Sequence, residues 1–206
     1  MRAGERKVAS DGYEVCLFPL EYMYISNGPH NQTAIDYLGW NANGRVLDCP
    51  MYAPFSGKVT YNGNDHNMII QSLDKVHLAN GTLNYCTMLM AHRNSPPPII
   101  GTVFSQGDLI YNTGNYGLST GDHVHLSTAP GHVSWNSSGL DLTGNTPGYN
   151  LMFVDDTVMV HDMGYPWATF GDTPVIQTKK KKHFPWQVYA RRLRRKRHWK
   201  ICKNIV

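Results

Sequence analysis

Short apolar segments separated by turn residues recur along the first 130 residues of the chain. Segment 85–91 (YCTMLMA) is a continuous apolar run with the length of a buried strand, and it ends directly before His92. The other apolar segments begin every 8–12 residues, with Gly, Pro and Asn between them, which is typical of antiparallel sheets. These further strand segments are predicted at 13–18, 22–25, 34–40, 46–52, 53–61, 67–72, a hairpin at 102–111, and 123–127.

Almost no segment has the spacing of an amphipathic helix. Gly, Asn, Tyr and Pro are plentiful, whereas long stretches of Ala, Leu, Glu and Lys at helical spacing are missing. We therefore predict a mostly β protein, with an antiparallel β-sandwich or barrel-like core and little helix. A chain of 206 residues is long enough to bury such a core, and its length favours one domain with an appendage.

Composition changes after this core. Residues 131–149 are rich in Gly, Ser and Asn, and the apolar pattern of 151–162 predicts one more hairpin, packed on the core. Residues 179–206 hold 12 of the 19 Lys and Arg residues and no Asp or Glu, so the preceding residues carry 7 basic and 15 acidic side chains, a formal charge of −8. We predict a core at 1–130 that includes the initial strand, an extension at 131–178 and a basic C-terminal tail at 179–206.

The basic tail calls for an interpretation separate from that of the acidic body. Its charge suits anionic wall polymers such as teichoic acids, a membrane surface or nucleic acid, of which nucleic acid is the least expected. The alternative is a solvated extension without a partner, because Trp186, Tyr189 and Leu193 begin an apolar helical stripe that does not continue.

The cysteines and the N-terminus bear on the cellular compartment. The four cysteines are widely spaced without a Cys-x-x-Cys pair, which favours reduced, mostly buried thiols over a disulfide scaffold or a structural zinc knot. The sequence has neither an apolar run of about 18 residues nor the apolar stretch of a secretory signal. We expect a protein made in the cytoplasm that something else carries to any site of action outside it.

Histidine and aspartate side chains lie near predicted strand ends. His123 and His125 are two positions apart on one strand, so both imidazoles project from the same face. His30, Asp36 and His92 supply three more groups. A catalytic zinc takes three protein ligands and leaves one position to water, so five candidates allow three ligands and two acid–base groups. The other histidines are interpreted as surface or core residues without a ligand role: His66, His77, His132, His161, His183 and His198.

Four motifs occur in order between residues 18 and 127. They are GPHNQTAIDYLG, which contains His30 and Asp36, then APFSGKV at 53–59, LMAH at 89–92, and GTVFSQGDLIYNTGNYGLSTGDHVHL at 101–126. In this order and spacing the chain resembles the lysostaphin-type zinc endopeptidases, also called glycyl-glycine endopeptidases or peptidoglycan DD-metalloendopeptidases. The similarity covers more than half of the chain.

The resemblance implies a fold of the duplicated hybrid motif type and roles for the five groups. His30, Asp36 and His125 would bind one zinc per chain, while His92 and His123 would act on the attacking water and the oxyanion. The substrates would be stem peptides or interpeptide bridges of peptidoglycan. The first motif departs from the family's common form, because His30 and Asp36 stand six rather than four residues apart. Six extended residues would span about 20 Å, so the chain must turn back between them.

Three functions follow, in decreasing order of support. The presence of all five groups favours an active wall peptidase, and the long first motif, familiar in phage-borne relatives, favours a bacteriophage or prophage product. Such a product would be a tail-associated wall hydrolase, with other phage tail proteins as partners, or an endolysin. The second function is a catalytically inactive structural or wall-binding protein that retains the fold. The third is a carbohydrate- or nucleic-acid-binding β module, for which only the tail speaks.

Overall fold

The structure is a computed structural model, which describes residues 1–30, 34–136, 139–140, 151–154, 159–161 and 168–169. The chain divides into two units, Met1–Thr173 and Pro174–Val206, and every described residue belongs to the first. The described residues form strands and loops without a helix, so the predicted antiparallel β fold is confirmed. Within these residues, none forms a helix of the length and apolar character that crossing a bilayer requires. The predicted basic tail, 179–206, lies outside the described residues.

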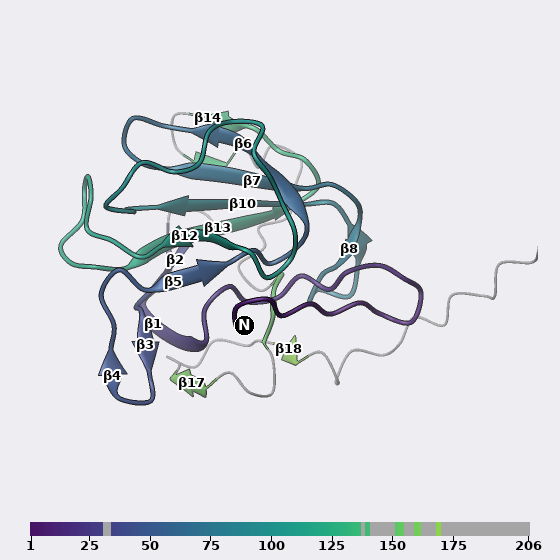
Figure 1. Cartoon of the computed structure of the whole chain (residues 1–206), viewed down its shortest axis with the longest axis horizontal. Helices are drawn as coiled ribbons and strands as arrows, with labels where there is room; N and C mark the ends of the chain where they lie inside the picture. Colours follow the sequence, from purple (N-terminus) through teal and green to yellow (C-terminus); the bar gives the residue numbers. More distant parts are fainter. Residues whose placement is uncertain (31–33, 137–138, 141–150, 155–158, 162–167, 170–206) are drawn as a thin grey trace, which may run out of the picture. The chain divides into compact units, whose positions relative to one another are not determined.

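An eight-stranded sheet forms the centre of the described unit (Figure 1). All its neighbouring strands pair antiparallel except β1 and β17, which are parallel. In spatial order the strands are β11 (Val103–Phe104), β6 (Gly57–Asn62), β7 (Met68–Ser72), β10 (Cys86–Ala91), β13 (Val124–Pro130), β2 (Ala34–Tyr37), β1 (Tyr22–His30) and β17 (Met159–His161).

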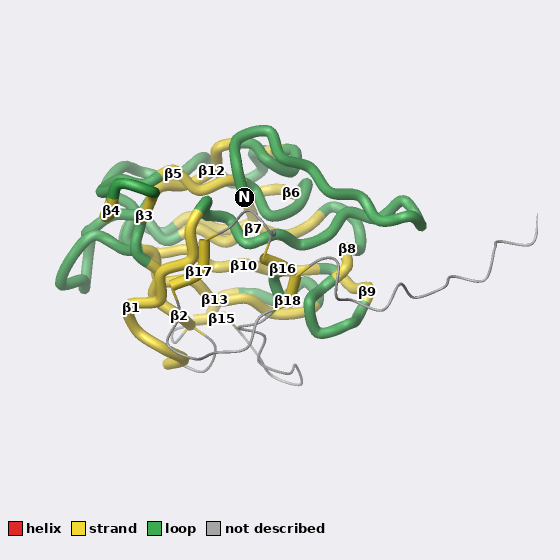
Figure 2. The backbone as a smooth tube through the Cα atoms, turned by 90° about the horizontal axis from the view of Figure 1, so that it is seen from below, coloured by secondary structure: helices red, strands yellow, loops and turns green. Residues whose placement is uncertain are grey.

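Five two-stranded sheets complete the described secondary structure. They are β5 (Pro50–Tyr52) with β12 (Leu109–Asn112), β3 (Trp40–Asn41) with β4 (Gly44–Arg45), β8 (Val76–His77) with β9 (Leu83–Asn84), β14 (Trp135–Asn136) with β15 (Gly139–Leu140), and β16 (Phe153–Val154) with β18 (Ala168–Thr169). The β5–β12 pair forms a second layer over the large sheet (Figure 2). Met51 of β5 and Tyr111 of β12 are fully buried in the main core together with residues of the sheet.

Strand β10 is covered on both of its faces, which explains its continuous apolar sequence. Met88 and Met90 point into the main core between the two layers. Leu89, on the opposite face, packs in a second cluster with Ile69 of β7 and Leu140. All six residues of β10 are buried, so the predicted central strand that delivers His92 is confirmed.

Both predicted hairpins pair differently in the structure. In 102–111, β11 pairs with β6 whereas β12 pairs with β5, because a tight turn at Gly107 (φ 88°) carries the chain from the sheet into the second layer. In 151–162, β16 pairs with β18 and β17 pairs with β1, both parallel, so the two described strands do not pair with each other. Local sequence favours a turn at these places, but packing of each strand on a different neighbour decides the pairing.

Candidate metal centre

Strands β1, β2 and β13 bring His30, Asp36 and His125 together. His125 of β13 lies directly opposite Asp36 of β2 in an antiparallel pair, so the two side chains share one face of the sheet. His30 is the last residue of β1, which pairs antiparallel with β2 and opposes His30 to Ala34. The chain therefore reverses direction between His30 and Asp36, as the long first motif requires.

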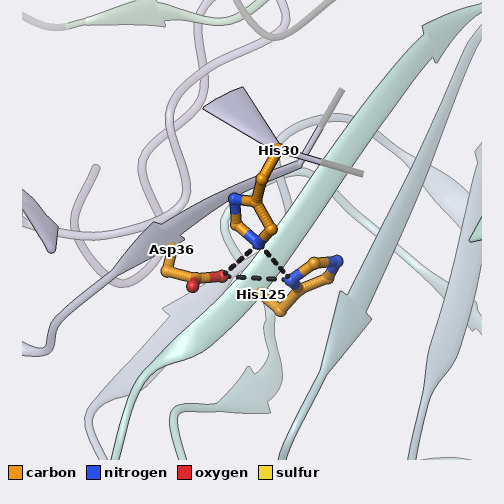
Figure 3. A group of neighbouring side chains, drawn as sticks. All are labelled: His30, Asp36 and His125. Carbon is orange, nitrogen blue, oxygen red and sulfur yellow. Dashed lines mark hydrogen bonds and ion pairs between the residues drawn. The ribbon is translucent and has the colours of Figure 1, made fainter. Parts of the chain in front are cut away.

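The polar atoms of these three side chains face one another (Figure 3). Nε2 of His30 lies 3.1 Å from Nδ1 of His125 and 3.4 Å from Oδ1 of Asp36, and Nδ1 of His125 lies 3.0 Å from the same Oδ1. Two ligand atoms of a tetrahedral zinc ion, each bonded at about 2.0–2.1 Å, are about 3.3 Å apart. The separations and the donor set, two imidazoles and a carboxylate, therefore fit a zinc ion, and the cluster could hold a metal.

Hydrogen bonds orient the ligand atoms of this cluster. The Nδ1–H group of His30 donates to the carbonyl oxygen of Gly28 at 2.7 Å, which leaves its Nε2 lone pair free for a metal. The side-chain amide of Asn27 donates to Oδ2 of Asp36 at 3.3 Å, while Oδ1 faces the histidines. Strand β1 thus supplies one candidate ligand, His30, and hydrogen bonds that orient both His30 and Asp36.

His92 and His123 lie beside the cluster, so the structure brings all five predicted side chains together. Nε2 of His123 lies 3.7 Å from Oδ1 of Asp36, and the ring centroids of His92 and His123 are 4.6 Å apart. Each ring is held through Nδ1, whose N–H group donates to the carbonyl of Tyr116 (His92, 2.9 Å) or of Gly121 (His123, 2.7 Å). In the neutral form this leaves Nε2 of each ring unprotonated.

The charge states suit a metal site with neighbouring bases. Burial raises the pKa of Asp36, but the hydrogen bond from His125 and the charges of the neighbouring histidines together lower it below its ordinary 3.8. Asp36 is thus ionised at neutral pH, as a metal ligand must be. Burial lowers the pKa of His92 from 6.5, against the opposing effect of its hydrogen bond to Tyr116, so this imidazole is neutral at pH 7.

Asp122 fixes the start of β13, a role that the sequence does not predict. Its carboxylate is buried and accepts hydrogen bonds from the Thr113 hydroxyl at 2.5 Å and from the Asp48 backbone N–H at 3.0 Å. Thr113 in turn accepts the Cys49 N–H at 2.9 Å. The partners lie 9 and 74 residues from Asp122, so no local pattern in the sequence indicates this network.

Gly114 lies against the backbones of both histidines beside the cluster. It exchanges two backbone hydrogen bonds with His123, of 3.0 and 2.9 Å. A Cβ atom at Gly114 would lie 2.2 Å from the carbonyl oxygen of His92 and 2.6 Å from the backbone nitrogen of Asn94. Only glycine allows the two segments to approach this closely.

Replacing Gly114 with alanine is expected to lower the free energy of unfolding by about 1–3 kcal/mol, because the backbone of His92 must move away. Urea unfolding of the wild-type and Gly114→Ala proteins measures the change. Gly121→Ala is the matched control in the same loop, since its Cβ would meet only a guanidinium nitrogen of Arg45, at 3.8 Å. Equal unfolding midpoints for all three proteins would contradict the close approach.

The remaining histidines with described side chains hydrogen-bond within the protein. Nε2 of His77 lies 3.0 Å from a carboxylate oxygen of Asp11, and Nε2 of His132 lies 2.9 Å from the carbonyl oxygen of Ser72. His66 hydrogen-bonds the backbone of the residue that follows His92. The side chains of His161, His183 and His198 lie outside the described residues.

One curated relative comes from a bacteriophage. No protein-family model matches the chain. Morphogenesis protein 1 of Bacillus phage B103 is 26% identical over 171 residues, which cover 78% of this chain and 46% of that protein. The chain thus spans about half the length of this relative.

Comparison with solved structures finds peptidases. The catalytic domain of the antimicrobial peptidase lysostaphin from Staphylococcus simulans matches 60% of this chain, with 84% of that domain covered, 17% identity and a TM-score of 0.37. In fold, the chain is similar to lysostaphin-type peptidases. A zinc-containing peptidase from Vibrio cholerae matches 60% of the chain and 42% of its own, with 18% identity and a TM-score of 0.41. The catalytic domain of the prophage-encoded M23 protein EnpA from Enterococcus faecalis, in a mutant form, matches 62% of this chain, with 81% of that domain covered, 17% identity and a TM-score of 0.37.

Proposed function

We propose that this protein is a zinc-dependent endopeptidase that hydrolyses peptide cross-links of bacterial peptidoglycan. The observation that carries the proposal is the convergence of five side chains from separate strands and loops. The candidate ligand atoms of His30, Asp36 and His125 lie 3.0–3.4 Å apart, and two further imidazoles lie beside them. A structural metal site has no need of the second pair, whereas hydrolysis does.

In this proposal, Nε2 of His30, Oδ1 of Asp36 and Nδ1 of His125 hold one zinc ion per chain. When bound, the zinc supplies Lewis acidity toward a peptide carbonyl and lowers the pKa of a water molecule. The motif resemblance supports the same division of roles. The carbonyl of Gly28 accepts the Nδ1–H group of His30 and so keeps Nε2 unprotonated. Zinc-binding histidines commonly donate their other ring N–H group in this way.

His92 and His123 are the proposed acid–base groups. Both present an unprotonated Nε2 in the neutral form, because the Nδ1–H group of each ring donates a hydrogen bond to a backbone carbonyl. One imidazole accepts the proton of the attacking water. The imidazolium that results then donates a hydrogen bond to the developing oxyanion or its proton to the leaving amine. The lowered pKa of His92 favours the neutral starting state.

We further propose that the protein is a phage or prophage product that acts at the cell wall. A phage morphogenesis protein as a relative and the long first motif support a tail-associated wall hydrolase, with other tail proteins as partners. The alternative phage role is that of an endolysin. Both roles use the same chemistry on the same wall peptides.

A suspension of purified bacterial cell walls is expected to lose turbidity when the protein is added. A chelator should stop the clearing, and added zinc should restore it, because the proposed site needs its metal to activate water. Walls with different cross-bridges should be compared, since the bond that is cut sets the preference. A protein that holds zinc but clears none of these walls would favour the inactive structural or wall-binding alternative.

A further inference from the structure

Three residues other than glycine adopt a left-handed backbone in the described part of the chain. They are Asp48 (φ 52°), His66 (φ 61°) and His92 (φ 83°). Such conformations cost free energy, and they persist where surrounding contacts impose them, often at functional sites. Two of the three are histidines, and both contact the same aromatic residue, Tyr116.

The backbone of Tyr116 makes two hydrogen bonds with His92, one with its imidazole and one with its backbone. The carbonyl oxygen of Tyr116 accepts the Nδ1–H group of His92 at 2.9 Å, and the N–H group of Tyr116 donates to the His92 carbonyl at 3.0 Å. The first bond sets the tautomer of the imidazole and the second fixes its backbone. The placement of His92 therefore depends on where the Tyr116 peptide groups lie.

The side chain of Tyr116 is held in turn by His66. The two rings are stacked, with centroids 3.8 Å apart and planes 16° from parallel. The Nδ1–H group of His66 donates to the carbonyl of Arg93 at 2.9 Å, and the carbonyl of His66 accepts the hydroxyl of Tyr111 at 2.7 Å. Tyr111 is fully buried, so His66 is tied to the core.

These contacts close a ring around His92. Tyr111 also accepts the N–H group of Arg93 at 3.1 Å, and Arg93 follows His92 in the chain. Tyr116 is the exposed member of this ring, because 42% of its surface is accessible and Gly117, which follows it, has a φ of 76°. Stacking on His66 ties the Tyr116 side chain to the core, and the N–H group of Asn115, which precedes Tyr116, donates to Oδ1 of Asn94 at 2.8 Å.

We propose that His66 is a positioning residue of the peptidase, which acts through its stacked partner Tyr116 to hold His92 in one orientation and one tautomer. The catalytic meaning of this role rests on the function proposed above. Without the stack, Tyr116 can still form both hydrogen bonds with His92. The position of its carbonyl oxygen, which accepts the Nδ1–H group of His92, is then no longer fixed. The His92 ring then samples orientations in which Nε2 is misplaced or carries the proton.

Nitrogen-15 NMR of histidine side chains in the zinc-loaded full-length protein tests this role. The wild-type spectrum should show His92 protonated at Nδ1, with the signal assigned by its absence from the His92→Ala protein. In Tyr116→Ala and in His66→Asn, we expect His92 signals that average or mix the two tautomers. Asn is chosen for position 66 because it tolerates a left-handed backbone. The double variant should show no greater change than the single variants, since both remove one stack.

Activity measurements accompany the spectra. The initial rate of wall clearing, followed against wall concentration, should show a kcat about tenfold lower in both single variants with little change in KM, the loss typical of an outer support. Tyr116→Phe, which keeps the stack, should restore both the His92 spectrum and the rate. Leu118→Ala is the control for the loop, because Leu118 is 99% exposed, and it should leave the His92 spectrum unchanged.

The outcomes separate the two proposals. A wild-type His92 spectrum in His66→Asn and Tyr116→Ala, with only a lower unfolding temperature, would overturn the positioning role. A wild-type protein that clears no walls would overturn the proposed function, and the spectra would still decide whether the stack holds His92.

Discussion

The His125→Ala protein is expected to lose its zinc. His125 supplies one of three ligand atoms, and its Nδ1 lies 3.0 Å from Oδ1 of Asp36. Removal of a ligand should weaken zinc binding by more than about a hundredfold, because loss of an outer support alone costs 10–100-fold. Elemental analysis after dialysis should find about one zinc per wild-type chain and almost none in the variant. Wall clearing should disappear with the metal.

His132→Ala is the matched control for this loss. His132 is an exposed histidine whose Nε2 hydrogen-bonds the carbonyl of Ser72, outside the cluster. Its replacement should leave the zinc content at the wild-type level. A His125→Ala protein that retains one zinc with wild-type affinity would show that the metal is held elsewhere.

The His123→Ala and His92→Ala proteins are expected to keep zinc but lose activity. Their rings lie beside the candidate ligands and are the proposed acid–base groups. Removal of such a group lowers the rate about 10²–10⁴-fold. The clearing rate of zinc-loaded protein measures the loss, and elemental analysis confirms the metal. His77→Ala is the control, because His77 forms its ion pair with Asp11 away from the site.

The two histidines distinguish the possible assignments. If His123→Ala also lost its zinc, His123 would be a ligand. Its Nε2 lies 3.7 Å from Oδ1 of Asp36 and would then bind the same ion. If both variants cleared walls at the wild-type rate, the acid–base role would be wrong while the metal site stood.

Local periodicity predicts much of this fold. The apolar run of 85–91 predicts a strand covered on both faces, and β10 is buried throughout because cores lie on both sides of it. The two-residue spacing of His123 and His125 predicts that both rings share one face of the sheet, and both rings do lie beside His92. These predictions succeed because they depend only on neighbours in the chain.

Contacts between distant segments could not be predicted in this way. The opposition of His125 to Asp36 depends on β2 entering the sheet beside β13, which no local pattern specifies. The prediction of a hairpin at 102–111 is wrong, because its two strands pair in different layers. His66 has no distinguishing neighbours in sequence, and its contact with Tyr116 joins residues 50 positions apart. Family motifs supply the grouping of the five site residues that periodicity alone does not.

Zinc held by this cluster is proposed to enable the protein to cut peptide bonds of the cell wall. New amino groups released from purified peptidoglycan measure that reaction directly, and mass spectrometry of the fragments identifies the bond. Amino groups are expected to appear with the zinc-loaded wild-type protein and to be absent with the zinc-loaded His123→Ala protein. Zinc-loaded wild-type protein that releases no amino groups from walls with any type of cross-bridge would contradict the proposal.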